Sequence, residues 1–390
     1  MITVEEARAL LFDLVSQLPS ETVALSDAAG RVLAQDVQAT RDQPPFAASS
    51  MDGYAVKSTE VELHAMFKVI GESAAGRSFQ GSVGPGQAVR IFTGAPIPEG
   101  ADFVVIQEDT ERRGDLITIS DLPGPKTNIR PAGVDFTAGT KISAPRRLRA
   151  EDVALMAAMN IAAVPVARKP VIALISTGDE LVMPGEVPGP DQIIASNTFG
   201  LKALLEEAGA HVRILPIAQD TVSSLRTAFE LAEGADLVVT IGGASVGDYD
   251  LVSDVSTGLG MEQSFYKIRM RPGKPLMAGR IGQTAMVGLP GNPVSAMVCG
   301  YLFLLPMVRR MLGAEQVLTP FQTAHLTEPL AENGPREHYM RAIRDEAGIR
   351  ACPDQDSSLL SVLAQANALL VRPPHDPARP ADDEVQYLPI

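Results

Sequence analysis

The pattern of apolar and polar positions changes along the chain and separates regions with different predicted secondary structure. Residues 3–15 repeat apolar positions at helical spacing, and Thr3 with Glu6 fits a capping box, so a helix is expected at the start. From about 24 to 169, short β-like runs alternate with turns rich in glycine and proline, and one helix is expected near 150–159. This pattern predicts a mostly β N-terminal region.

The region from about 170 to 312 alternates apolar runs with helical segments. Strands are expected at 171–175, 212–216, 236–241 and 284–289, and helices at 197–208, at 220–232 and from Pro293 onward. Strands that alternate with helices of this length predict a doubly wound α/β domain. The last stretch, from about 318 to 390, returns to short strands and predicts a small separate β domain.

Composition narrows the class of protein. A chain of 390 residues with 45% hydrophobic residues is expected to build several cores, and two distant cysteines predict a reduced compartment without a disulfide framework. The start of the chain lacks the pattern of a secretory signal, and the apolar run at 297–308 is interrupted by Gly300 and Pro306. The net charge of −14 argues against nucleic acid or an anionic membrane as the main partner. We therefore expect a cytoplasmic protein.

Unusual residues follow three of the predicted parallel strands. They are Asp179 and Glu180 after the first, Gly242, Gly243, Ser245, Gly247 and Asp250 after the second, and Pro290, Gly291 and Asn292 before the helix that begins at Pro293. Ligands of open α/β sheets bind at this end of the strands. Glycines let the backbone approach a ligand, free amides and a hydroxyl suit phosphate, and carboxylates suit a hard cation.

Each of these loops is an ordinary turn if it is taken alone. Three of them at the same end of one sheet favour a binding site for an anionic ligand. The segment 267–275 adds Lys267, Arg269 and Arg271 on one face of a predicted strand, followed by Lys274. Such residues can also form a solvated edge strand, but in a chain of negative net charge the cluster favours phosphate or oxyanion binding.

Eight segments in order along the chain resemble the molybdopterin molybdenumtransferase family, which includes the gephyrin E domain. They read SSMDGYAV, RIFTGAPIP, GADFVVIQED, NIRPAGVDF, STGDEL, GGASVGDYD, RPGKP and GLPGNPVSA. The resemblance implies α/β plus β domains: an elongated N-terminal domain (1–168) with a lid-like β insertion (about 42–142), a molybdopterin-binding α/β domain (169–314) and a β-barrel-like C-terminal domain (315–390). It also implies a homodimer with each active site between subunits.

The family's reaction inserts molybdate into adenylylated molybdopterin and releases AMP in the presence of Mg²⁺. Carried over by motif, the implied catalytic residues are Asp52, Thr93, Asp135, Glu180, Asp220, Asp250, Lys267, Arg271 and Lys274, with Glu180, Asp220 and Asp250 as metal ligands. The implied substrate-binding residues are Gly242, Gly243, Ser245, Gly247, Pro290, Gly291, Asn292, Ser295, Arg341 and Ser357. Val134 stands where the family often has Glu, and Arg271 where it often has Lys.

The resulting hypothesis assigns the amides at 292–295 and the loop at 242–245 to the pterin phosphate. Asp52, Thr93 and Asp135 are expected to close the cleft, from the partner subunit if they lie far away in one chain. The resemblance also implies transient contact with the molybdopterin adenylyltransferase and with molybdoenzyme maturation proteins. A pyrophosphatase on the same α/β domain and a non-enzymatic scaffold remain alternatives, and the choice between molybdate and tungstate stays open.

Overall fold

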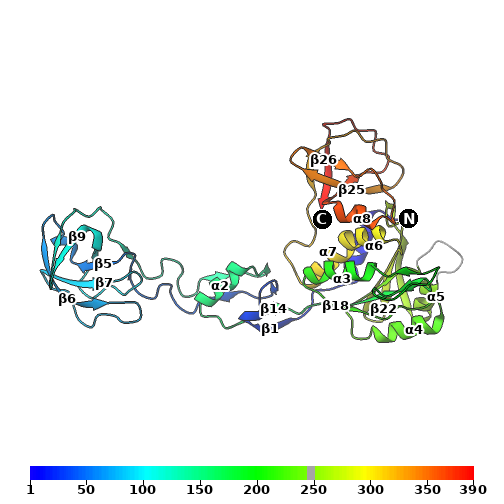
Figure 1. Cartoon of the computed structure of the whole chain (residues 1–390). Helices are drawn as coiled ribbons and strands as arrows, with labels where there is room; N and C mark the ends of the chain where they lie inside the picture. Colours follow the sequence, from blue (N-terminus) through cyan, green and yellow to red (C-terminus); the bar gives the residue numbers. More distant parts are fainter. Residues whose placement is uncertain (244–250) are drawn as a thin grey trace.

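The molecule is elongated, with a β unit at one end, an α/β unit at the other and a smaller sheet between them (Figure 1). The computed structural model describes residues 1–243 and 251–390. A second β unit, formed by the C-terminal residues, lies against the α/β unit (Figure 1). The expected combination of α/β and β parts in several units is confirmed, and the exact domain limits stay predictions.

The first helix begins as its sequence predicts but packs outside the N-terminal region. Helix α1 (Val4–Asp13) starts with the capping box, in which the Thr3 hydroxyl accepts a hydrogen bond from the Glu6 amide at 3.1 Å. Its buried side chains, such as Leu11, join the core between the α/β sheet and its helices. The chain thus crosses from the α/β unit into the N-terminal region after α1.

The middle sheet is antiparallel and is built from segments on both sides of the distant β unit. Its order is β1 (Ser20–Ala24), β14 (Ala163–Ala167), β2 (Val32–Leu33), β13 (Arg146–Arg147), with helix α2 (Ala150–Ala158) beside it. Two short pairs lead outward, β3 (Val37–Gln38) with β12 (Lys141–Ile142) and β4 (Ala48–Ser49) with β11 (Ile129–Arg130). The distant unit is a six-stranded sheet in the order β8 (Phe103–Ile106), β5 (Gly53–Val56), β7 (Gln87–Ile91), β6 (Met66–Ser73), β10 (Leu116–Ile119), β9 (Thr110–Arg113).

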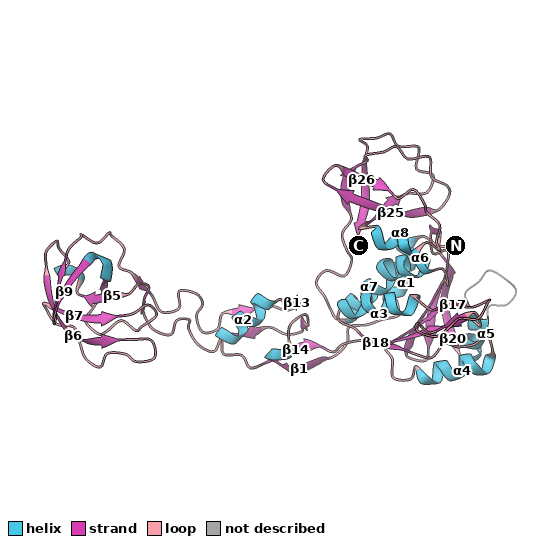
Figure 2. Cartoon of the chain, viewed as in Figure 1, coloured by secondary structure: helices cyan, strands magenta, loops and turns pink. Residues whose placement is uncertain are grey.

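The α/β unit is doubly wound, as expected, but its sheet is mixed. The order is β18 (His211–Ile214), β15 (Val171–Ser176), β19 (Leu237–Ile241), β23 (Thr284–Leu289), β22 (Pro275–Ile281), β20 (Met261–Lys267). The first four strands are parallel, whereas β22 and β20 are antiparallel to their neighbours. Helices α3 (Asn197–Glu207), α6 (Pro293–Cys299) and α7 (Leu305–Met311) cover one face, and α4 (Val222–Leu231) and α5 (Leu251–Gly258) the other (Figure 2).

Helices α6 and α7 are joined by a π-helical turn, Gly300–Leu304, into one long apolar helix. By length and composition alone, Pro293–Met311 could cross a membrane, but 78% of its most apolar window is buried inside the protein. A methyl group on Gly300 would lie 2.7 Å from Leu201 of α3, so the glycine lets the two helices approach closely. The apolar surface of this helix is therefore used in the core.

The C-terminal strands form an almost closed barrel. The order is β21 (Met270–Arg271), β25 (Glu337–Asp345), β27 (Ala368–Arg372), β28 (Glu384–Pro389), β24 (Gln322–His325), with β26 (Gly348–Ala351) also on β25. A bridge between Leu326, directly after β24, and Ile349 of β26 brings the β24 end of this order back to the strand that pairs with β25. Helix α8 (Leu360–Gln365) lies beside the barrel, and β21 comes from the α/β unit, so a shared strand ties the two units together.

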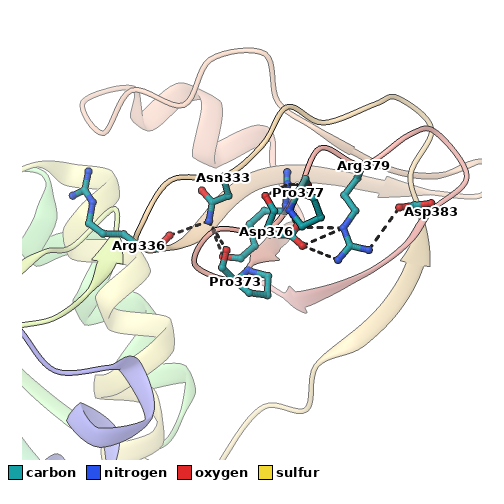
Figure 3. A network of polar contacts seen from close by, with 8 residues as sticks. Asn333, Arg336, Pro373, Asp376, Pro377, Arg379 and Asp383 are labelled. Atoms are coloured by element: carbon teal, nitrogen blue, oxygen red, sulfur yellow. Dashed lines mark hydrogen bonds and ion pairs between the residues drawn. The ribbon is translucent and has the colours of Figure 1, made fainter.

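A buried ionic network fixes two loops at one end of this barrel (Figure 3). Asp376 accepts hydrogen bonds from Arg372 and, at 2.7 Å, from Arg379. The side-chain amide of Asn333 donates to the carbonyl oxygens of Arg336 and Pro373. The network therefore joins the loop before β25 to the loop after β27.

Candidate active site

A cavity of about 590 Å³ lies at the carboxyl ends of the parallel strands. Its walls come from the loops after β15, β19 and β23, together with the two-stranded arm of β16 (Leu181–Val182) and β17 (Ile193–Ile194). The strands end level with one another, because Ser176 pairs with Ile241 and Ile241 with Leu289. This common end brings Glu180, Asp220, Gly242, Gly243 and residues 290–292 into one cavity.

The glycine pair after β19 has a backbone that other residues rarely adopt. Gly242 and Gly243 have φ values of 95° and 68°. A Cβ atom on Gly242 would lie 2.6 Å from the carbonyl oxygen of Thr177, and one on Gly243 would lie 2.3 Å from Val252. Side chains are thus excluded at both positions, and bare backbone faces the cavity.

Glu180 and Asp220 line the cavity, and Asp179 lies next to both without lining it. The amide of Asp220 donates to the Asp179 carboxylate at 3.0 Å, and Glu180 lies on the same loop as Asp179. Partial loss of hydration and the negative charges of Asp179 and Glu180 raise the pKa of Asp220. A divalent cation would relieve this repulsion, and the oxygen donors suit Mg²⁺. In residues 1–243 and 251–390, however, no group of three His, Cys, Asp or Glu side chains is placed to hold a metal ion.

The start of helix α6 departs from the expectation of a row of free amides. Pro293 has no N–H group, and the amide of Val294 donates to the carbonyl oxygen of Ser357 at 3.1 Å. The Asn292 side chain also donates to the Ser357 hydroxyl at 2.9 Å. Ser357 belongs to the C-terminal unit, so this unit closes part of the helix terminus. Ser295 is buried in the first turn of α6 and does not line the cavity.

The basic segment lies beside the cavity rather than in its lining. Arg271 is exposed, Lys267 and Lys274 are half-buried, and Lys267 lies over the ring of Tyr266. The lining includes Pro275, which directly follows Lys274. The segment is thus positioned next to the cavity entrance of the α/β unit.

Arg341 is fully buried in the C-terminal unit, in contact with the loop that carries Ser357. Its guanidinium group donates to the carbonyl oxygens of Asp354 and Asp356, while no residue in the described part of the chain pairs with its Nε and Nη1 atoms. Burial, opposed by nearby acids, lowers the pKa of Arg341. His338 in the same unit is also buried, and burial with the charges of neighbouring arginines lowers its pKa to about 3. The histidine is therefore neutral beside the arginine.

Asp52, Thr93 and Asp135 lie in the distant β unit and its connection, far from the cavity within one chain (Figure 1). The Asp52 carboxylate accepts hydrogen bonds from the Thr93 amide at 2.7 Å and from its hydroxyl at 2.8 Å. These bonds lower the pKa of Asp52. Asp135 lines a separate cavity of about 480 Å³ together with Val134. The structure therefore places the predicted residues at two locations.

Three predicted residues, Ser245, Gly247 and Asp250, lie outside the described residues. Several cavity residues were missed by sequence reasoning. Thr177, Ile193, Ile194 and Ser358 all line the cavity. The position of Thr177 directly after a buried strand was a usable signal, because its neighbours in the same loop were selected on that ground. The arm and Ser358 reach the cavity through tertiary packing, which local sequence patterns do not encode.

Three family models match the chain in order. They are the MoeA N-terminal region (domain I and II) over residues 2–160, the Probable molybdopterin binding domain over residues 173–310, and the MoeA C-terminal region (domain IV) over residues 323–390. The cavity described above lies mainly in the second of these. The fold and the site thus define a protein of molybdenum cofactor biosynthesis that is built around a molybdopterin-binding domain.

Relatives match over nearly the whole chain. A molybdopterin molybdenumtransferase of Nostoc sp. is 36% identical, covering 96% of this chain and 90% of the relative, and one of Haemophilus influenzae is 35% identical, covering 95% and 94%. A crystal structure of the molybdopterin biosynthesis MoeA protein of Pyrococcus horikoshii is 29% identical, with a TM-score of 0.86 over 100% of this chain and 99% of the other. The chain belongs to the molybdopterin molybdenumtransferase family and is an enzyme of the transferase class.

Proposed function

We propose that this chain inserts molybdate into adenylylated molybdopterin and releases AMP in a reaction that depends on Mg²⁺. The observation that carries the proposal is the cavity itself, which is lined by bare glycine backbone and by two carboxylates and lies beside a basic segment. Phosphate groups suit the glycine backbone, and an oxyanion suits the arginine and lysine side chains. The names of the nearly full-length relatives support transfer of molybdenum to molybdopterin.

In this mechanism the chain's own residues bind and orient the two substrates. The backbone at Gly242 and Gly243 would hold the phosphate of the pterin substrate. Glu180 and Asp220 would hold Mg²⁺, which supplies charge neutralisation at the phosphoanhydride when it is bound. Lys274 and Arg271 would attract molybdate and balance the charge of the departing AMP. Arg341 would add positive charge close to Arg271.

The remote residues fit a site that two chains complete. Asp52 and Thr93 form a preorganised pair, yet they lie far from the cavity of their own chain (Figure 1). We propose that in a homodimer they approach the partner's cavity, as does Asp135. Transient contacts with the adenylyltransferase that supplies the substrate and with molybdoenzyme maturation proteins, and a cytoplasmic location, are part of the same proposal.

The proposal is tested by AMP release from adenylylated molybdopterin with Mg²⁺ and with molybdate, tungstate or no oxyanion. Release that depends on an oxyanion is expected, and the faster of the two reactions identifies the preferred metal. Release at the same rate without an oxyanion would instead identify a pyrophosphatase. Binding of the substrate without any release would identify a scaffold.

Replacement of Asp220 by Asn is expected to raise the Mg²⁺ concentration for half-maximal turnover by roughly tenfold or more, because one ligand charge is lost. In the absence of Mg²⁺, the Asp220→Asn variant should be at least as stable as the wild type, because it removes one of three neighbouring negative charges. Glu230→Gln on the exposed face of α4 is the matched control for a lost charge. An unchanged Mg²⁺ dependence for Asp220→Asn would remove Asp220 from the metal site.

A further inference from the structure

Thr177 carries a hydroxyl group whose position in the fold is unusual. The residue directly follows β15, is only 3% exposed and lines the cavity. Its Oγ1 atom is buried and has no hydrogen-bond partner among the described residues. Buried polar groups in folded proteins are nearly always paired, because an unpaired one has lost its water without a replacement. A missing partner at a cavity wall therefore calls for an explanation.

The hydroxyl lies directly beneath the glycine pair. A Cβ atom on either Gly242 or Gly243 would come within 3.0 Å of Thr177 Oγ1. Two backbone hydrogen bonds anchor the neighbouring segments: the Thr177 amide donates to the Ile241 carbonyl and the Gly242 amide to the Leu289 carbonyl. Neither glycine carries a side chain, and the hydroxyl is nevertheless shielded from solvent in this arrangement. The hydroxyl is thus held in place at the position where bare backbone meets the ligand space.

A second buried threonine provides the internal comparison. Thr240 in β19 is fully buried and its hydroxyl also lacks a partner within residues 1–243 and 251–390, but it does not line the cavity. A methyl group on Gly288 would lie 3.2 Å from this hydroxyl, so its surroundings are the interior of the sheet. An unpaired hydroxyl alone is therefore compatible with simple packing, and the cavity distinguishes Thr177 from Thr240.

We propose that the Thr177 hydroxyl is a substrate-binding donor that gains its partner when a phosphate oxygen of the ligand enters the cavity. This inference rests on the proposed function and names a binding residue for it. Because the hydroxyl is already shielded from water, a bond to phosphate does not replace a bond to solvent and contributes more to affinity. Contact requires a small shift of the glycine pair, and glycine has more backbone freedom than any other residue type.

The test compares three variants of the full chain, Thr177→Val, Thr177→Ser and Thr240→Val. Thermal unfolding is measured without ligand, and Kd is measured by calorimetry for AMP, molybdopterin and inorganic phosphate. Thr177→Val preserves the shape and removes an unpaired hydroxyl, so its Tm should be equal to or higher than that of the wild type. Its affinity for at least one of the phosphate ligands should fall roughly tenfold or more.

The remaining variants separate binding from packing. Thr177→Ser should restore affinity to within about threefold of the wild type, and Thr240→Val should change no Kd. The ligand that loses affinity shows whether the pterin phosphate or the adenylate contacts the hydroxyl. Wild-type affinity of Thr177→Val for all three ligands, or no binding of any of them by the wild type, would overturn the inference. Binding with the expected losses but no AMP release would leave Thr177 as a ligand residue and reject the proposed reaction alone.

Discussion

Replacement of Gly242 by Ala is expected to reduce AMP release by roughly 100-fold, because a displacement of about 1 Å in a positioning loop has effects of this size. The new methyl group would lie 2.6 Å from the carbonyl oxygen of Thr177, which is part of the backbone and cannot rotate away. Hydrogen bonds from the amides of Thr177 and Gly242 hold both segments to neighbouring strands. Relief of the collision must therefore move the loop that faces the ligand.

Gly234→Ala is the matched control for this variant. Gly234 also has a positive φ, of 79°, but a methyl group there would meet no atom within 4 Å. It should lose about 1 kcal/mol of stability from the left-handed backbone and keep its full turnover. If Gly242→Ala turns over substrate within threefold of the wild-type rate at a saturating substrate concentration, the glycine pair does not position the ligand.

The sequence predicted best those features that local patterns encode. The capping box at Thr3 and Glu6 forms in the structure, and the strand expected at 284–289 has the observed limits. Continuous apolar runs correctly indicated the buried parallel strands of the α/β unit. Positive φ at the glycine pair followed from the residue type, since glycine alone adopts it without strain.

Features that depend on tertiary contacts were missed. The direction of β22 and β20 was not predicted, because an apolar run does not show whether its neighbour is parallel or antiparallel. The contact between Ser357 and the start of α6 joins positions more than sixty residues apart in the chain. It occupies an amide that the sequence pattern alone left free.

The candidate site shows the same division. Glu180, Asp220 and the glycine pair could be placed in one cavity because loops after parallel strands meet at one edge of a sheet. Asp52 and Thr93 were selected by resemblance, and their distance from the cavity could not be read from the sequence. Their hydrogen-bonded pairing is a property of the distant β unit alone.

Replacement of Asp376 by Ala should strongly destabilise the C-terminal barrel. Asp376 is 6% exposed and Arg372 is 2% exposed, so the variant leaves a buried guanidinium group without its counter-charge (Figure 3). Loss of one partner from a buried ion pair costs about 3 to 5 kcal/mol. Asp383→Ala is the control, because its contact with Arg379 is 3.6 Å long and partly exposed, and the expected loss is below about 1 kcal/mol.

The same network predicts how stability depends on pH. Burial alone would raise the pKa of Asp376, but hydrogen bonds from Arg379 and Arg372 outweigh it and hold the pKa below the ordinary value of 3.8. A carboxyl group with a lowered folded-state pKa stabilises the fold above its unfolded-state pKa and loses that effect as pH falls. Urea unfolding of the wild type should therefore show stability decreasing below about pH 4, and Asp376→Ala should show a smaller decrease over the same range. If the free energy of unfolding depends on pH equally in the two proteins, other carboxylates control the loss of stability in acid, and the Asp376 ion pairs do not hold the barrel loops together.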